Sequence, residues 1–349
     1  MLSGNPSPHL ARITDGFRTS RQQVGAQLRS SEVTSPTARI RTIVVPLDGS
    51  TTAEQALPIA TLLALRSAAQ LVVIRVHEPP RLAMAYANEW DREIREREDD
   101  YLVGIAARMR GSTHGPVERM LLDGHPADAI STFAAGRESP LIVMASHGRT
   151  GASRFWIGSV TDAVLRRSQI PVLMVRASSG QIRHPDAIQR ILVPLDGSAM
   201  AEQILPFAAE IASEVGAEVN LVQVVDPADV PRTAPPLAED ALAAVVRDAD
   251  AGLKVVASNM TREHPGLSVH VRIRVAESAA SSIVDAASAH ACELVAMTSW
   301  SRGLRRAILG SVADKVVRAG PPFILLIRPR SGTIETSAAA AAHGELLHR

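Results

Sequence analysis

Short, continuously apolar runs alternate with longer stretches of helical periodicity along most of the chain. A run without alternating polar positions predicts a parallel strand that is covered by helices on both faces. The first such strands are expected at Ile40–Pro46, Leu71–His77, Val117–Leu122, Leu141–Ala145 and Val172–Val175, with helices at about Thr51–Leu65, Trp90–Arg110, Ala127–Ala135 and Ser159–Arg167. This alternation predicts an α/β fold, namely a doubly wound, parallel, five-stranded sheet.

The same pattern then occurs a second time. The segment VPLDGSTTAEQALPIA from Val45 aligns without gaps to VPLDGSAMAEQILPFA from Val193, and the later blocks PLIVMASHG and CELVAMTSW align after small shifts. The second set of strands is expected near Ile191–Pro194, Val219–Val225, Ser268–Val275, Leu294–Thr298 and Phe323–Ile327. A duplication of this length predicts two tandem domains of one fold, each with its own sheet.

The boundaries of these domains follow from where the periodicity stops. Segments without sustained apolar periodicity are expected to be disordered, and a stretch rich in Ser, Gly and Pro suits a linker. We therefore expect an N-terminal tail at 1–38, a first domain at 39–177, a linker at 178–187, a second domain at 188–330 and a C-terminal tail at 331–349. Pro58 and Pro206 fall inside the first helix of each copy and predict a kink there.

Composition narrows the functional classes. A formal net charge of +1 argues against a general surface for nucleic acid, and no apolar run approaches the length that crosses a bilayer. Cys292 is the single cysteine, which excludes an intrachain disulfide and a thiolate metal cluster. We read Cys292 as a buried apolar residue rather than a nucleophile. These features together predict a cytoplasmic protein.

The motif LDGS follows the first strand of each copy. Ser50 or Thr51 can cap the next helix, with Glu54 completing a capping box from Thr51. Asp48 has two interpretations. It lies at the carboxyl end of a central strand, where doubly wound sheets bind ligands, so its carboxylate can accept hydrogen bonds from a base or sugar, or hold a divalent cation through water. Alternatively, Asp48 only caps the helix that follows.

A second motif, ASHGRTGASRFWIGSV, begins at Ala145 and leads from a buried strand into a helix. Gly148 and Gly151 let the loop approach a ligand closely, and Gly158 and Ser159 present free backbone N–H groups at a helix N-terminus. Arginines add positive charge to the same loop at Arg149 and Arg154. The motif indicates a phosphate cradle, although it matches neither the P-loop nor the dinucleotide fingerprint.

Together, VPLDGS, LLDGHP and ASHG with nine residues between Gly148 and Gly158 resemble the universal stress protein family, and the resemblance covers both copies. It implies the strand order 3-2-1-4-5, pairing of the last strands between domains, a possible homodimer, and an ATP site, with or without Mg²⁺. Asp48 would then lie near the adenosine, Val76 would contact the adenine through its backbone, and the loop with the following helix start would hold the phosphates. The implied cofactor-binding residues of the first copy are Pro46, Leu47, Asp48, Val76, Gly124, Ala145, His147, Gly148, Arg149, Gly151, Gly158, Ser159 and Val160.

The second copy keeps part of this set, namely Asp196, Val224, Gly310 and Ser311. In the alignment above, Trp300 replaces Gly148 and Glu277 replaces Gly124. An indole and a carboxylate at the phosphate end should obstruct or repel a triphosphate, although a gap that shifts SRG against RTG would soften the objection from the indole and not that from the carboxylate. We therefore expect the better-formed site in the first domain, and weak binding or a mainly structural role in the second.

Three functional hypotheses remain. The first is a nucleotide-dependent stress-response or signalling module without efficient turnover, since no residue resembles a dedicated base and no Walker lysine is present. The second is a slow ATPase or nucleotidyl-transfer enzyme that uses Asp48 and a bound Mg²⁺. The third is a scaffold whose nucleotide pockets are vestigial.

Overall fold

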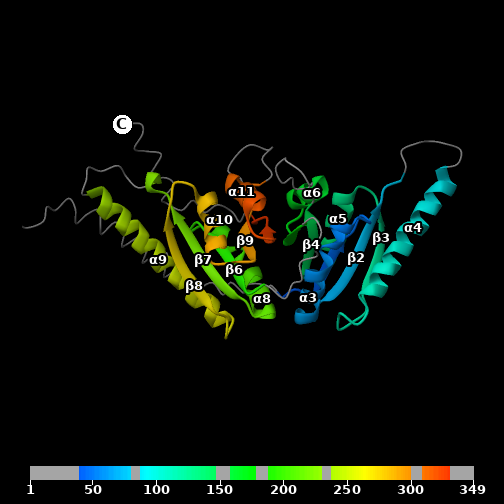
Figure 1. The fold of residues 1–349 in the computed structure, drawn as a ribbon, viewed down its shortest axis with the longest axis horizontal. Coiled ribbons are helices and arrows are strands. Elements are labelled where there is room, and N and C mark those ends of the chain that lie inside the picture. The colour runs from blue at the N-terminus through cyan, green and yellow to red at the C-terminus, as the bar shows by residue number, and fades with distance from the viewer. Residues whose placement is uncertain are drawn as a thin grey trace, which may run out of the picture. The chain divides into compact units, whose positions relative to one another are not determined.

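Strands and helices alternate along the chain as predicted (Figure 1), in a computed structural model that describes residues 39–79, 87–146, 158–177, 188–229, 237–299 and 309–330. The elements of the first copy are β1 Thr42–Pro46, α2 Thr51–Glu54, α3 Leu57–Ser67, β2 Gln70–His77, α4 Ala87–Arg108, β3 Glu118–Asp123, α5 Pro126–Ala135, β4 Pro140–Ser146, α6 Ser159–Arg167 and β5 Val172–Arg176. The expected tails and linker at 1–38, 178–187 and 331–349 lie outside the described residues.

The second copy repeats this order with one added turn of 3-10 helix. Its elements are β6 Arg190–Leu195, α7 Ala199–Glu202, α8 Leu205–Val215, β7 Glu218–Val225, η1 Pro227–Asp229, α9 Leu237–Glu263, β8 Val269–Val275, α10 Ala279–Ala289, β9 Leu294–Thr298, α11 Ser311–Ala319 and β10 Phe323–Ile327. Every described strand that was expected from an apolar run is present.

The strands form one ten-stranded sheet in the order β3-β2-β1-β4-β5-β10-β9-β6-β7-β8. Each copy therefore has the predicted order 3-2-1-4-5, and its strands are parallel. The two halves join where β5 pairs with β10 antiparallel, with Leu173 opposite Leu325. The last strands were expected to pair between domains, and they do so within one chain.

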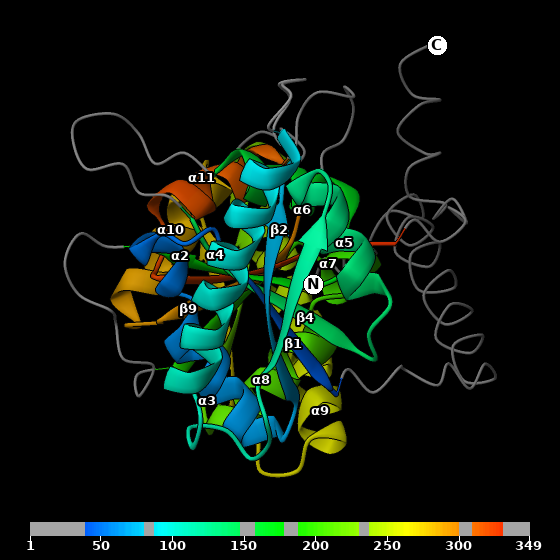
Figure 2. The same cartoon turned by 90° about the vertical axis from the view of Figure 1, so that its right-hand side faces the viewer.

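Helices cover both faces of the sheet, which explains why its central strands such as β1, β4 and β10 are almost entirely apolar. Alternate residues of one strand enter different cores: Val45 and Val73 belong to the cluster under α3, α4, α8 and α9, whereas Val44 and Val72 belong to the cluster under α5, α6, α10 and α11. Figure 2 shows this for the first copy, with α3 and α4 on one side of the strands and α5 and α6 on the other.

The first helix of each copy differs from the expected single kinked helix, because it is divided into two. In the first copy α2 ends at Glu54, and Pro58 lies in the first turn of α3. Proline lacks an N–H group and is tolerated at a helix start, so the chain begins a new helix there instead of bending an existing one. Pro206 has the same place in α8.

The expected capping box is also wrong in part. Ser50 caps α2 by accepting a hydrogen bond from the Ala53 N–H at 3.1 Å. Glu54 contacts α4 instead. It accepts a hydrogen bond from the Tyr101 hydroxyl at 3.0 Å and forms an ion pair with Arg108 at 2.6 Å. A long-range contact therefore replaces the local one that the sequence suggested.

Cys292 is buried, and burial more than the neighbouring Glu293 carboxylate raises the pKa of its thiol to about 11. This agrees with its interpretation as an apolar residue. Within the described part of the chain, no helix has both the length and the apolar character needed to span a membrane.

Candidate functional site

The carboxyl ends of the parallel strands meet at one edge of the sheet, and most predicted site residues of the first copy lie there. The Leu47 N–H donates to the Ile74 carbonyl at 2.8 Å, which fixes the end of β1 beside β2. The Gly124 N–H donates to the His77 carbonyl at 3.2 Å, which holds the turn after β3 next to Val76. Ala145 lies near the end of β4 and is buried.

The second copy shows what this edge encloses. A cavity of about 540 Å³ opens at the ends of β6, β7 and β9 and is lined by Pro194, Leu195, Asp196, Ser198, Met200, Ala201, Val222, Val224, Ala279, Ile283, Met297, Thr298, Leu309, Ser311, Val312 and Ala313. Ligand pockets of small molecules commonly measure about 300–1,000 Å³. Of the residues predicted for this copy, Asp196, Val224 and Ser311 line the cavity, and Gly310 is the N-cap of α11 beside it.

The sequence repeat relates residues of this lining to residues of the first copy. Pro194, Leu195, Asp196, Val224, Ser311 and Val312 correspond in the repeat to Pro46, Leu47, Asp48, Val76, Ser159 and Val160, all of which were predicted as site residues. Val76 and Val160 pack against the same apolar cluster, as do Val224 and Val312. The predicted His147, Gly148, Arg149 and Gly151 lie outside the described residues, so their part in the site stays a prediction.

Asp48 takes part in the helix start and is also exposed at the site edge. Its Oδ1 accepts hydrogen bonds from the Ser50 N–H at 2.9 Å and from the Ser50 hydroxyl at 2.6 Å. Asp196 makes the same pair of bonds with Ser198, at 3.0 and 2.6 Å. The aspartate thus orients the serine that caps the helix, and both interpretations of this residue are compatible with its position.

Two helices point uncapped N-termini toward the site. Gly158 precedes α6 and Gly310 precedes α11, and neither glycine can supply a side-chain cap, in contrast to Ser50 and Ser198 at α2 and α7. The first N–H groups of a helix have no partner inside the helix and carry the positive end of its dipole. An anion can therefore be bound at the starts of α6 and α11.

The structure corrects the alignment between the two glycine loops. The Ser146 hydroxyl bonds to the Val175 carbonyl, and the Ser299 hydroxyl bonds in the same way to the Ile327 carbonyl, so these two serines are equivalent. Trp300 then corresponds to His147 and not to Gly148, and the second loop is one residue shorter. The error arose because a strand that is apolar at every position aligns almost equally well one residue out of register.

The second argument for a blocked second site is also weaker than expected. Glu277 is exposed and is absent from the lining of the cavity. The acidic residue that does line the cavity is Asp196, and on the neighbouring α7 burial, and to a smaller extent the Asp196 carboxylate, raises the pKa of Glu202 above its ordinary value. The ranking of the first site above the second stays a prediction, because Glu277 does not line the cavity and Trp300, now opposite His147, lies outside the described residues.

Sequence reasoning missed several residues of the cavity, namely Met200, Ala201, Val222, Ile283, Met297, Thr298 and Leu309. A signal for some of them was present. Val222 lies two residues before Val224 on β7, so its side chain points to the same face of the sheet. For the helix residues the sequence carries no comparable signal, because a lining apolar residue and a core apolar residue look alike.

The described residues contain no group of three His, Cys, Asp or Glu side chains that could hold a metal ion. Asp48 and Asp196 each offer one carboxylate at the edge, and each already accepts two hydrogen bonds from a serine. The donor set of the protein therefore fits a cation held mainly by a ligand, and does not fit a metal held by the protein alone.

The LDGS turns provide a matched pair of substitutions. Gly49 and Gly197 have φ values of +84° and +78°, a region that costs a residue with a Cβ about 1–2 kcal/mol. A Cβ on Gly49 would lie 2.7 Å from Arg75 Nη1, whereas on Gly197 it would lie 3.5 Å from Gln223 Nε2. We expect Gly49→Ala to lower the free energy of unfolding by about 2–3 kcal/mol and Gly197→Ala by about 1–2 kcal/mol.

Urea unfolding of the two variants measures this difference. The control is Arg75→Gln, which gives the first copy the residue of the second and should remove the difference between the two alanine variants. If both alanine variants lose the same free energy of unfolding in the wild-type background, the Arg75 side chain moves aside at no cost and only backbone strain destabilises the variants.

Comparisons with known proteins point to one family. The model of the universal stress protein family matches residues 39–176 and again residues 187–328. A universal stress protein of Thermus aquaticus is 32% identical over 138 residues, which are 39% of this chain and 98% of that protein. A universal stress protein of Mycolicibacterium smegmatis is 25% identical over 231 residues, 65% of this chain and 74% of that protein.

A solved structure shares the fold over most of the chain. The crystal structure of a universal stress protein from Archaeoglobus fulgidus superposes with a TM-score of 0.64 at 19% identity, and the match covers 84% of this chain and 99% of that one. At this level of identity the likeness concerns the fold alone.

Proposed function

Because this chain belongs to the universal stress protein family, with two tandem domains of that family, we propose that it binds ATP in both domains and acts as a nucleotide-dependent module of a stress response. The observation that carries this proposal is the cavity at the strand ends of the second domain. Its lining contains the positions that the repeat relates to the residues predicted in the first domain.

The chemistry of the cavity suits an adenine nucleotide. Its apolar part, which includes Val222, Val224 and Met297, can hold a flat base. The bare N-terminus of α11 beside Ser311 offers N–H groups to phosphate oxygens. The carboxylate of Asp196 can accept hydrogen bonds from a sugar hydroxyl. In the first domain, Val76, Ser159 and Asp48 would have these three roles.

Magnesium would enter with the nucleotide. ATP carries Mg²⁺ on its phosphates, and sites of this kind commonly use few protein carboxylates and several waters. Asp48 in the first domain and Asp196 in the second are the residues that could contact such an ion through water.

We favour a ligand-binding role over efficient catalysis. Among the described residues, no histidine, lysine or cysteine lines the cavity of the second domain. General-base and nucleophilic catalysis can also use carboxylates, and Asp196 is the one ionisable side chain of this lining, where it already accepts two hydrogen bonds from Ser198. The alternative is a slow hydrolysis in which Asp48 orients the attacking water.

The single cysteine is buried and reduced, which fits a protein of the reducing cytoplasm.

The direct test is mass spectrometry of small molecules released from the purified full-length protein, followed by calorimetric titration with ATP. We expect adenine nucleotide to be released and two sites per chain to be filled. Incubation with ATP for hours, followed by product analysis, should give less than one ADP or AMP per chain. Steady accumulation of product would establish an enzyme, and no binding at either domain would favour the scaffold hypothesis.

A further inference from the structure

A buried histidine connects the first domain's site edge to helix α4. His77 is the last residue of β2, and its side chain has no exposed surface. Its Nδ1 lies 2.7 Å from Glu98 Oε2 and its Nε2 lies 2.9 Å from Asp91 Oδ1. A neutral imidazole has one N–H and one lone pair, so both nitrogens can donate to ionised carboxylates only in the protonated ring.

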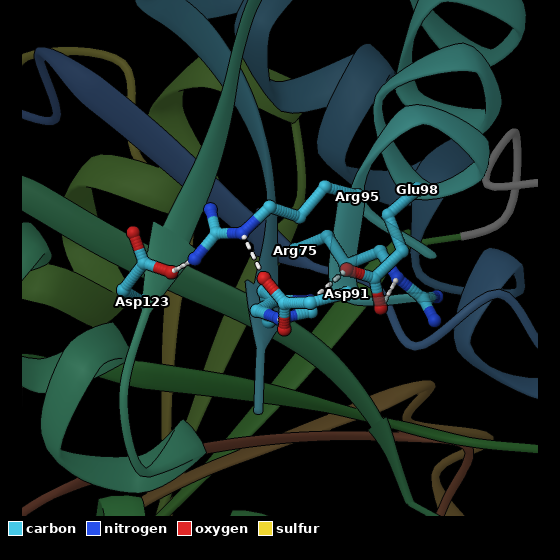
Figure 3. A network of polar contacts seen from close by, with 6 residues as sticks. Arg75, Asp91, Arg95, Glu98 and Asp123 are labelled. Carbon is cyan, nitrogen blue, oxygen red and sulfur yellow. Dashed lines mark hydrogen bonds and ion pairs between the residues drawn. The ribbon is translucent and has the colours of Figure 1, made fainter. Parts of the chain in front are cut away.

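The carboxylates around this ring are themselves paired (Figure 3). Arg75 of β2 pairs with Glu98 at 3.0 Å. Arg95 of α4 bonds to Asp91 at 3.1 Å and also to Asp123, which ends β3. In the described part of the chain, these are the charged groups joined to His77 directly or through one or two partners, and they come from β2, α4 and β3. The network therefore joins the ends of two strands to the first half of the helix.

The electrostatics of Asp91 agree with this geometry. The hydrogen bond from His77, followed by the contacts with Arg95, lowers the pKa of Asp91 below its ordinary value although burial opposes the shift. Asp91 is thus an ionised partner of the ring at neutral pH.

At the positions that correspond to this network, the second domain has no charged side chains. The pattern of buried and exposed residues on α4 matches that on α9 when Leu102 is placed on Leu253 and Met109 on Met260. The counterparts of the network are then uncharged: Val225 for His77, Gln223 for Arg75, Leu242 for Asp91, Val246 for Arg95, Ala249 for Glu98 and Val275 for Asp123. Since a charged cluster in the interior commonly adds little stability compared with apolar residues, the fold itself does not require it.

The network is attached to the proposed nucleotide site at two points. His77 follows Val76, the residue expected at the adenine, and the His77 carbonyl accepts the Gly124 N–H at 3.2 Å. His77 thus contacts α4 through its ring and the turn after β3 through its backbone, and the second domain keeps only the backbone bond, from the Ala276 N–H to the Val225 carbonyl at 3.0 Å.

We propose that His77 is a positioning residue of the first nucleotide site, and that its protonated ring makes ligand binding there depend on pH while binding in the second domain does not. This proposal rests on the proposed function. When the ring loses a proton, Asp91 or Glu98 faces a nitrogen lone pair at hydrogen-bond distance and loses its donor. The unpaired carboxylate then favours separation of the first half of α4 from the sheet, which loosens the edge at Val76 and Gly124.

The experiment is hydrogen exchange followed by mass spectrometry on the full chain, titrated with ATP at about pH 6 and about pH 9. Peptides that contain β2 and β3 report the first domain, and those that contain β7 and β8 report the second. After correction for the intrinsic exchange rate, the first domain should lose about fivefold or more of its ATP affinity at the higher pH. The second domain should not follow it.

The matched triple variant carries the residues of the second domain at the ring and at its two direct partners: His77→Val, Asp91→Leu and Glu98→Ala. It should fold, and the ATP affinity of its two domains should vary with pH in the same way. Because ATP itself changes charge in this range, the second domain and this variant are the references. A wild-type first domain that tracks its second domain, or a triple variant that keeps the difference, would contradict the proposal.

The protein without ATP separates this inference from the proposed function. Exchange at the start of α4 should rise at the higher pH in the wild-type chain and remain flat in the triple variant. If neither domain binds ATP, the proposed function fails, and this measurement still decides whether His77 holds α4 in a pH-dependent way.

Discussion

A chain that carries Ser159→Pro and Ser311→Pro is expected to lose ATP affinity by about 10- to 100-fold at each site while it keeps its fold. Hydrogen bonds to charged groups contribute about 1.5–3 kcal/mol, and each proline removes one N–H donor at the start of α6 or α11. Proline is favoured at the first position of a helix, so the helix itself should persist.

The local backbone permits these substitutions. Gly158 has φ −55° and ψ 148°, and Gly310 has φ −56° and ψ 154°. These angles belong to the extended region that a residue before proline adopts. A loss of binding therefore cannot be assigned to a strained backbone.

Calorimetric titration with ATP measures the effect, and circular dichroism checks the fold. The controls are Ser159→Ala and Ser311→Ala, which keep the N–H groups and remove only the hydroxyls, and they should change the affinity by a few-fold. If the double proline variant binds ATP as tightly as the wild-type chain, the helix N-termini do not hold the phosphates.

Leu325→Ala should lower the free energy of unfolding by about 2–5 kcal/mol, the range found when a buried leucine is truncated. Leu325 is fully buried in β10 and lies opposite the equally buried Leu173 of β5, at the antiparallel junction of the two domains. The truncation leaves a void in the apolar cluster that both domains share.

The comparison variant is Val255→Ala on α9, where the side chain is 61% exposed. It should change the free energy of unfolding by about 0.5 kcal/mol or less. Both values come from urea unfolding curves. A loss of less than about 1 kcal/mol for Leu325→Ala would mean that the junction packs loosely and that the domains are held together elsewhere.

The sequence alone determined the strands, their parallel arrangement and the duplication. Runs such as Leu71–Ile74 are apolar at every position because helices cover both faces of the sheet, and such a local pattern can be recognised without knowing which elements pack against the strand. It also located the edge that carries Asp48 and Asp196, since the carboxyl ends of parallel strands meet at one side. The capping role of Ser50 followed from short-range chemistry for the same reason.

The tertiary structure decided what depends on distant partners. An apolar strand such as β10 can pair in one chain or between two chains, and only the fold shows it beside β5. The register of Ser146 and Ser299 needed their hydrogen bonds, because uniformly apolar strands slip without penalty in an alignment. The network around His77 joins residues from two strands and a helix. Burial and charge pairing are properties of contacts across the fold, so no local pattern of residues could have revealed them.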